Sequence, residues 1–329
     1  MSAQLRRKVT STRRRLPAFV LVLVVAALCI AGVIYKGAEV TQVNVNDGGI
    51  WVTNKSKQMV GHLDYEAHIL DGALRTEATN FDVGQAGETV TVSDLISLTV
   101  APVNVTQVSL GSPTALPSGS SAMQGGDVLG VLNPTDGTLW TTSATAPSPA
   151  NLSEGAALSS NMGTSAFVTG LDGSVYSLAA SGTLTTVKRQ GTVDQAATAR
   201  IEGIPEDAQL SITVVGDQVV ALDSQSNTLA LCQDGARRPS CHVDLGAAGV
   251  EEGGILQLAG PKADSVLLAT PSALVSIPLA GGTPTITPAT ESGVSGNPAA
   301  PVRHEGCAYG AWSVSGAYMR ACDDPSANK

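Results

Sequence analysis

The chain has 329 residues, with 28 acidic and 19 basic side chains and a formal net charge of −9. Only 3% of its residues are aromatic, and a composition rich in Gly, Ser, Thr, Ala and Val favours strands and turns over long helices. The acidic balance argues against DNA, RNA or anionic lipid as a partner of the bulk of the chain. It does not identify a ligand, because acidic surfaces commonly serve solubility alone.

The chain begins with a basic segment, residues 1–15, in which six Arg and Lys side chains precede any acidic residue. Residues 16–35 follow and contain no charged side chain. Twenty helical residues span roughly 30 Å, about the thickness of the hydrocarbon core of a bilayer. The sequence therefore predicts a single-pass plasma-membrane protein, with residues 1–15 in the cytoplasm, a transmembrane helix at 16–35 and residues 39–329 outside the cell.

A cleaved secretory signal is the competing interpretation of this segment. Such signals have a shorter apolar region and a small-residue cleavage site, and Ala31-Gly32-Val33 matches that site only weakly. The length of the apolar run favours a retained anchor. In both cases the remainder is exported, and it carries all 28 acidic residues and only 13 of the 19 basic ones.

Four of the five cysteines lie beyond the predicted helix in two local pairs, Cys232 with Cys241 and Cys307 with Cys322. In an oxidising compartment such an even set predicts disulfides. We favour local pairing over the two long-range alternatives, because each pair brackets a short, turn-rich segment. A metal site is disfavoured, because Cys-x2-Cys spacing and nearby His pairs are missing. Cys29 lies inside the predicted helix, where simple packing explains it.

Residues 39–329 contain a recurring hairpin pattern. An apolar strand is followed by a turn rich in Gly, Asp, Asn or Ser and then by a second apolar strand, and Asp-Gly between alternating apolar residues is a strong hairpin signal. The predicted strand pairs are 128–133 with 138–142, 166–171 with 174–178, 218–222 with 228–232, 265–269 with 273–279 and 307–314 with 317–322, and a strand at 50–54 precedes them.

The second strands of these hairpins recur at intervals near 44 residues, and a weaker unit is expected around 89–110, inside a double interval. Repeats of about 40–45 residues with paired strands are the signature of β-propeller blades. We therefore predict an all-β fold after the helix, a β-propeller-like domain of about six to seven blades. Two or three immunoglobulin-like sandwiches are the alternative, but neither cysteine pair has the separation typical of those domains.

Closure of the ring is a separate question. A propeller usually closes by pairing a strand from one end of the chain with strands from the other. The segment Val40–Thr53 can supply such a strand if it pairs with the last blade. The alternative is an incomplete ring in a fragment of a longer protein, because the sequence stops at 323–329, just after an apparent second strand.

Three features resemble the start of long actinobacterial cell-surface proteins. They are the stretch RRRLPAFVLVLVVAALCIAGVIY, the stretch VTQVNVNDGGIWVTN, and hairpins of the DGxxY type. The resemblance covers most of the chain and implies one N-terminal anchor, a propeller-like region and then immunoglobulin-like and fibronectin type III modules. It implies that this chain is an N-terminal fragment with a surface or envelope role, and it supplies no catalytic residue.

The best candidate for a metal site is the group His62, Asp64, Glu66 and His68, which would share one face if all four lay on a single strand. A solvated strand face is the simpler explanation, so we predict no metal and no cofactor. The sequence contains no Gly-x-Ser-x-Gly elbow and no phosphate-binding loop. Sequence neighbours such as Glu251-Glu252 diverge in direction and are poor glycosidase candidates. We therefore predict no catalytic residue.

Two functional interpretations remain open. The first is a non-catalytic binding or scaffold module, held at the membrane and offering one face to an envelope protein or a cell-wall glycan. The second is an extracellular hydrolase or lyase acting on polysaccharide, which requires carboxylates or histidines that converge at the propeller axis. The predicted anchor, the repeat and the lack of a catalytic constellation in the sequence favour the first.

Overall fold

The computed structural model describes residues 49–64, 67–148, 152, 159–160, 163–190, 193–232, 241–289, 296–304 and 306–322. The chain divides into two compact units, residues 1–45 and 46–329, and every described residue belongs to the second. The predicted cytoplasmic segment 1–15 and the predicted helix 16–35 lie outside the described residues. Within the described ranges, no helix is long and apolar enough to cross a membrane.

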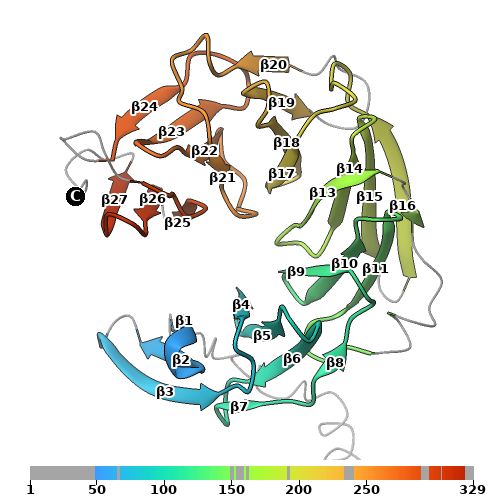
Figure 1. The fold of residues 1–329 in the computed structure, drawn as a ribbon, viewed down its shortest axis with the longest axis vertical. Coiled ribbons are helices and arrows are strands. Elements are labelled where there is room, and N and C mark those ends of the chain that lie inside the picture. Colours follow the sequence, from blue (N-terminus) through green and yellow to red (C-terminus); the bar gives the residue numbers. More distant parts are fainter. Residues whose placement is uncertain are drawn as a thin grey trace, which may run out of the picture. The chain divides into compact units, whose positions relative to one another are not determined.

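The second unit is built from seven antiparallel sheets, the blades, which follow one another around a common axis (Figure 1). The first blade contains β1 (Ile50–Asn54), the short 3-10 helix η1 (Lys55–Lys57), β2 (Met59–Asp64) and β3 (Ile69–Arg75). The second contains β4 (Phe81–Ala86), β5 (Thr89–Asp94), β6 (Thr99–Asn104), β7 (Ser109–Leu110) and β8 (Thr114–Ala115). The third contains β9 (Ser121–Gly125), β10 (Val128–Asn133), β11 (Thr138–Ser143) and β12 (Ser159–Ser160).

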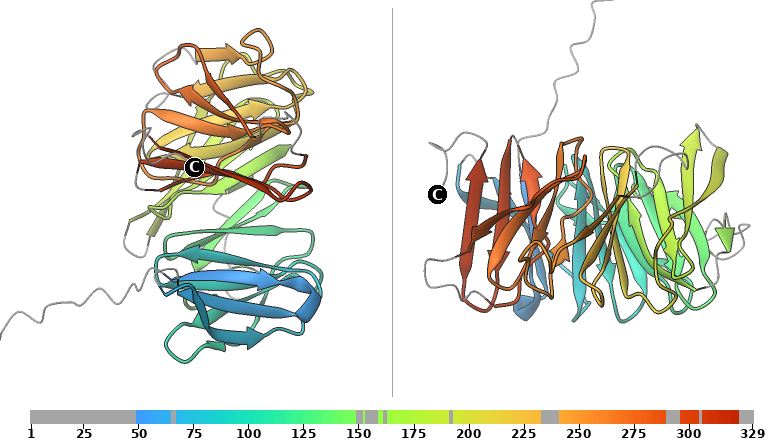
Figure 2. Two further views of the ribbon diagram at one scale, coloured as in Figure 1. Left: turned by 90° about the vertical axis from the view of Figure 1, so that its left-hand side faces the viewer. Right: turned by 90° about the horizontal axis from the view of Figure 1, so that it is seen from above.

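The remaining blades continue in chain order, and Figure 2 shows their strands crossing the thickness of the ring. The fourth contains β13 (Thr164–Thr169), β14 (Val175–Ala179), β15 (Thr183–Gln190) and β16 (Val193–Arg200). The fifth contains β17 (Leu210–Val215), β18 (Gln218–Asp223), β19 (Thr228–Cys232) and β20 (Cys241–Asp244). The sixth contains β21 (Ile255–Leu256), β22 (Ser265–Ala269), β23 (Ala273–Pro278) and β24 (Thr285–Pro288), and the seventh contains β25 (Val302–His304), β26 (Cys307–Trp312) and β27 (Ala317–Cys322).

The predicted all-β propeller is therefore confirmed, with seven blades. Each predicted hairpin is present, and the weaker unit expected around 89–110 is the second blade. The alternative of immunoglobulin-like sandwiches in series is wrong, because neighbouring sheets pack around one axis.

The predicted repeat length was uneven for a structural reason. The hairpins at 128–142 and 218–232 are the second and third strands of their blades, whereas the hairpin at 166–178 is the first and second. Equivalent positions recur more regularly. Leu139, Leu184 and Leu229 are each the second residue of a third strand, they are all buried, and they lie about 45 residues apart, within the usual range for a blade.

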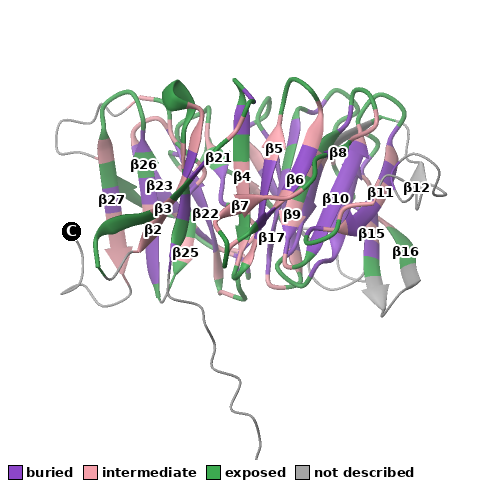
Figure 3. Cartoon of the chain, turned by 90° about the horizontal axis from the view of Figure 1, so that it is seen from below, coloured by how far each residue is buried: buried purple, intermediate pink, exposed green. Residues whose placement is uncertain are grey.

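The hydrophobic core lies between neighbouring blades, so central strands such as β10, β14 and β18 are buried along almost their whole length (Figure 3). One cluster joins the first blade to the second through Trp51, Val60 and Phe81. A blade has two faces that must leave water, and one sheet cannot cover both of its own faces. Each blade therefore depends on its neighbours for stability.

The junction between the sixth and seventh blades contains the fully buried Trp312. Its indole packs with Leu267, Leu274 and Met319, and its Nε1 donates a hydrogen bond to the carbonyl oxygen of Thr270 at 2.8 Å. A buried indole N–H usually finds such a partner. The last blade is thus tied to its neighbour by apolar packing and by one buried hydrogen bond.

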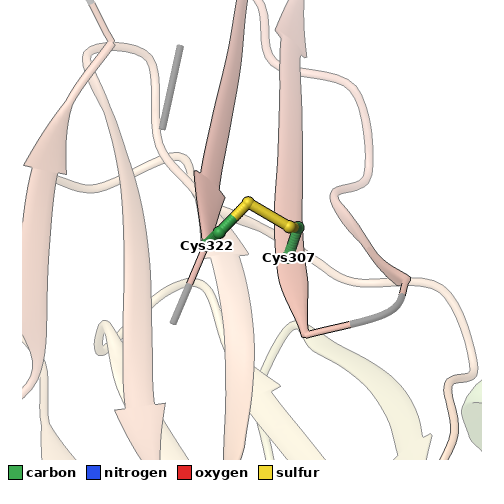
Figure 4. The surroundings of a disulfide bond; sticks show 2 residues. All are labelled: Cys307 and Cys322. Carbon is green, nitrogen blue, oxygen red and sulfur yellow. A yellow bond between two sulfur atoms is a disulfide. The ribbon is translucent and has the colours of Figure 1, made fainter. Parts of the chain in front are cut away.

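The cysteine pairs have different outcomes. Cys307 and Cys322 lie opposite one another on β26 and β27 and form a disulfide, which confirms that prediction (Figure 4). Cys232 and Cys241 lie on the neighbouring strands β19 and β20, where Leu231 pairs with Cys241. The side chains of that second pair are outside the described part of the structure, so their disulfide stays a prediction.

The segment Val40–Thr53, predicted to pair with the last blade and close the ring, is described only in part. Ile50–Thr53 belongs to β1 and pairs with β2 in the first blade, not with the last blade, so this part of the expectation is wrong. Residues 40–48 lie outside the described residues. Among the described strands, no pairing joins the first blade to the seventh.

Replacing both Cys307 and Cys322 by Ser should lower the free energy of unfolding by about 3 kcal/mol, because the bond spans a sequence separation of 15 residues and restricts the unfolded chain. Urea denaturation of the full chain, followed by tryptophan fluorescence, measures the change. Wild type and variant, both in reductant, provide the control and should have equal unfolding midpoints, because reductant also opens the predicted Cys232–Cys241 bond in both. Equal unfolding midpoints for oxidised wild type and variant would contradict a stabilising role.

Candidate functional site

The predicted metal group does not share one strand. Strand β2 ends at Asp64, and His68 lies in the turn before β3 with a positive φ of 56°. The premise of a single strand carrying both histidines is therefore wrong. Glu66 is outside the described residues. Within the part of the chain that the structure describes, no group of three or more His, Cys, Asp and Glu side chains is placed to hold a metal ion.

His62 instead packs within the first blade. Its ring lies 5.2 Å from the ring of Trp51, and its Nδ1 lies 2.6 Å from Oδ1 of Asp71. Asp71 has no cross-strand partner, because the register shifts between the pairs His62–Gly72 and Leu63–Leu70. This bulge aims the carboxylate at the imidazole. The contact fixes the edge of the blade next to a buried tryptophan.

Carboxylate and amide side chains are used repeatedly to hold turns. The second strand of three blades and β1 of the first blade end in Asn or Asp, and the side-chain oxygen accepts a backbone N–H two or three residues later at 2.8–3.2 Å. These residues are Asn54, Asp94, Asn133 and Asp223. The hydrogen bond from the backbone N–H of Ser97 is the main cause that lowers the pKa of Asp94.

Asp223 is the acidic side chain that is buried among the described residues, at 6% exposure. Its Oδ1 accepts the backbone N–H groups of Gln209 and Gln225, and its Oδ2 accepts the hydroxyl of Ser226 at 2.6 Å. It borders a cavity of about 210 Å³ that is lined largely by apolar groups. Both oxygens of this carboxylate therefore accept hydrogen bonds from the protein itself, which is typical of a structural group rather than of a general base.

His242 borders the same cavity, and its Nε2 lies 2.8 Å from the carbonyl oxygen of Glu202. This contact ties β20 to the loop before β17. Through these hydrogen-bond contacts, Asp223 and His242 fix the segment 201–209 against the fifth blade. The cavity resembles packing space under a loop more than a reaction site.

Neighbouring blades are also joined by glutamine side chains on two first strands. Gln85 on β4 accepts the backbone N–H of Trp51 at 3.0 Å and donates to the carbonyl oxygen of Gly49 at 2.9 Å. Gln124 on β9 accepts the hydroxyl of Thr91 at 2.6 Å and donates to the carbonyl oxygen of Thr89 at 2.8 Å. Each carboxamide uses its donor and its acceptor on the preceding blade, and we call this contact the glutamine bridge.

The first blade has one exposed apolar face, the open face, made by Ile50, Val52, Leu63, Leu70 and Ala73. Cross-strand pairing aligns Ile50 with Leu63 and Leu63 with Leu70, opposite the face that packs on the second blade. Ile50 is 44% exposed and Leu70 is 65% exposed. Contiguous exposed apolar side chains of this kind mark interaction surfaces.

The seventh blade also exposes a face at its end of the series. Trp312 and Met319 pack against the sixth blade, while Tyr318 is 78% exposed on the opposite face together with Val302. The guanidinium of Arg320 lies 6.0 Å from the ring centroid of Tyr309 on that side. Both ends of the blade series therefore present faces of the kind that neighbours bury elsewhere in the ring.

Comparison with known proteins establishes the fold alone. No protein-family model matches the chain, and no curated protein matches it. The chain is similar to apo AztD from Citrobacter koseri, with a TM-score of 0.57, 9% identity, and coverage of 85% of this chain and 92% of that one. It is similar to the β-propeller domain of Cps50 (Swd1) from Myceliophteria thermophila, with a TM-score of 0.53, 11% identity and coverage of 83% and 95%. BamB from Moraxella catarrhalis gives a TM-score of 0.51, 10% identity and coverage of 84% and 79%. These values support a shared propeller and leave function to be argued from the site.

Replacing Asp223 by Ala should lower the free energy of unfolding by about 1.5–3 kcal/mol, because the backbone N–H groups of Gln209 and Gln225 and the hydroxyl of Ser226 lose a charged acceptor. Replacing the exposed Asp207 by Ala is the matched control and should change stability by less than about 0.5 kcal/mol. Urea titrations of both variants give the comparison. A neutral Asp223→Ala variant would show that the carboxylate does not hold the loop.

Proposed function

We propose that this chain is a membrane-anchored, extracytoplasmic β-propeller that acts as a non-catalytic binding or scaffold module at the cell envelope. The observation that carries the proposal is the open face of the first blade. Its aliphatic side chains are exposed at a position where the other blades are covered by a neighbour. Burying such a face against a partner removes apolar surface from water and stabilises the complex.

The chemistry of the open face favours a protein partner over a cell-wall glycan. Ile50, Val52 and Leu70 carry no polar atom in their side chains, and no aromatic ring lies among the residues of that face. Sugars are recognised through hydrogen bonds and through stacking on aromatic rings, which these aliphatic groups do not provide. A protein surface with its own apolar centre and polar rim is complementary to such a face. We therefore commit to an envelope protein as the partner.

The alternative is a hydrolase or lyase acting on polysaccharide, which requires titratable groups aimed at a substrate. The carboxylates of Asp94, Asp172 and Asp223 instead accept hydrogen bonds from the turns that follow them. His62 contacts the carboxylate of Asp71, and His242 contacts the carbonyl oxygen of Glu202. Both contacts hold neighbouring segments of the propeller together. These contacts favour the non-catalytic proposal.

The location rests on the sequence. The uncharged stretch 16–35 and the cations before it support an anchor with the propeller outside the cell. The disulfide between Cys307 and Cys322 is compatible with an oxidising compartment. The resemblance to long actinobacterial surface proteins, with immunoglobulin-like and fibronectin type III modules further along, supports the same envelope role.

A photo-crosslinking amino acid at Leu70 of the full chain, in cells, should yield one discrete crosslinked protein in the membrane fraction, because the open face binds a partner there. The matched control carries the same group at Ile96, which is 66% exposed on the second blade. Replacing Ile50 and Val52 by Ser should remove the crosslink at position 70 while leaving the circular dichroism unchanged. Equal crosslinking at both positions, or a crosslink that survives the serine substitutions, would refute the assignment of the face.

A further inference from the structure

The first strand of the seventh blade carries Arg303 at a position where two other blades carry a bridging glutamine. In the sequence, the first strands of the second, third and seventh blades are each followed by two residues, one Gly and one acidic, before the next strand begins. The penultimate residue of these strands is Gln85 in β4, Gln124 in β9 and Arg303 in β25. The two glutamines form the glutamine bridges to the preceding blade. Arg303 thus occupies the position that holds a bridging glutamine in the second and third blades, whereas β13 and β17 have Val168 and Val214 there.

Arg303 reaches the preceding blade as the glutamines do, but with different chemistry. Its Nη2 donates to the hydroxyl of Ser265, the first residue of β22, at 2.7 Å. A guanidinium carries five N–H donors and no acceptor, so it cannot supply the accepting half of a glutamine bridge. The Nε of Arg303 is buried and has no hydrogen-bond partner among the described residues.

Ser265 shows a second unused donor at the same place. Its Oγ accepts from Arg303 and also from the hydroxyl of Ser276 at 2.9 Å, so its own hydrogen points away from both. Arg303, Ser265 and Ser276 are all partly exposed residues, although the Nε atom of Arg303 is itself buried. The sixth and seventh blades lie side by side (Figure 1), and the hydrogen bond from Arg303 to Ser265 brings donors and a positive charge together between them.

The charge has no acidic counterpart in the described ranges. Two ion pairs among the described residues are His62 with Asp71 and Arg200 with Glu202, and neither includes Arg303. Glu305 lies outside the described residues. A half-buried cation with an unused N–H gains most from an anionic acceptor, because charge-assisted hydrogen bonds are about twice as strong as neutral ones.

We propose that Arg303, Ser265 and Ser276 form a binding site for an oxyanion, either a phosphate or a carboxylate group of a ligand. The anion supplies the acceptor that a glutamine carboxamide supplies in the second and third blades. The planar guanidinium fork matches the oxygen spacing of both groups. The site is independent of the open face on the first blade, so the two proposals can fail separately.

Isothermal titration of the full chain in detergent micelles, at low ionic strength with chloride as the only other anion, tests the site. Inorganic phosphate, methyl phosphate and acetate are the three probes. Tighter binding of inorganic phosphate than of methyl phosphate indicates a free anion as the ligand, equal binding indicates a phosphate ester, and preference for acetate indicates a carboxylate. Arg303→Gln should weaken the preferred probe at least about tenfold, and Arg303→Lys should weaken it less, because it retains the charge but not the fork.

Glutamine at position 303 is the residue that the repeat uses in two other blades, so Arg303→Gln should keep the unfolding midpoint of the wild type. The control is Arg75→Gln, which removes the same charge from an exposed residue of β3. It should leave binding unchanged. Ser265→Ala should weaken binding several-fold. It provides a second test of the site if Arg303→Gln does not fold. The proposal is overturned if no probe binds the wild type, if Arg303→Gln or Ser265→Ala binds like the wild type, or if Arg75→Gln weakens binding equally.

Discussion

The whole structure depends on the burial of each sheet between two others. In the cluster between the fifth and sixth blades, Val220 and Leu229 from one blade meet Val266 and Val275 from the next. The side chains are small aliphatic groups, which explains how a chain with so few aromatic residues forms a continuous core. The same constraint produces the exceptions. At each end of the series a face keeps its apolar character, and there the side chains of Leu70 and Tyr318 are exposed.

The candidate sites lie where this regularity is broken. The open face is an inter-blade surface without the neighbour that covers its equivalents, and Arg303 is a bridge position whose residue no longer matches the bridge. Most other polar groups are accounted for by the fold, as the turn-holding oxygens of Asn54, Asp94 and Asn133 show. The two glutamine bridges are informative because they show how a polar side chain at this position can be satisfied by the fold alone.

Local features could be predicted from the sequence, and long-range ones could not. Hairpins such as 128–133 with 138–142 follow from turn chemistry between adjacent segments, and all were found. The two-residue outer strands β7, β8 and β12 are too short to show a pattern. The glutamine bridges join residues more than 30 positions apart, so no periodicity reports them. The prediction that His62 and His68 share one strand is wrong, because strand β2 ends at Asp64 and the residue pattern does not show that end.

The disulfide of the last blade makes the two ends of the blade series unequal. A terminal blade has packing on one side only, and local opening of a fold begins where neighbours are fewest. In the seventh blade the covalent bond holds β27 against β26, so its outermost described strand cannot separate from the sheet without reduction. The described strands of the first blade have no such staple. Fraying in an oxidising medium should therefore run in one direction, starting at β1 to β3, and reduction should let it start at both ends.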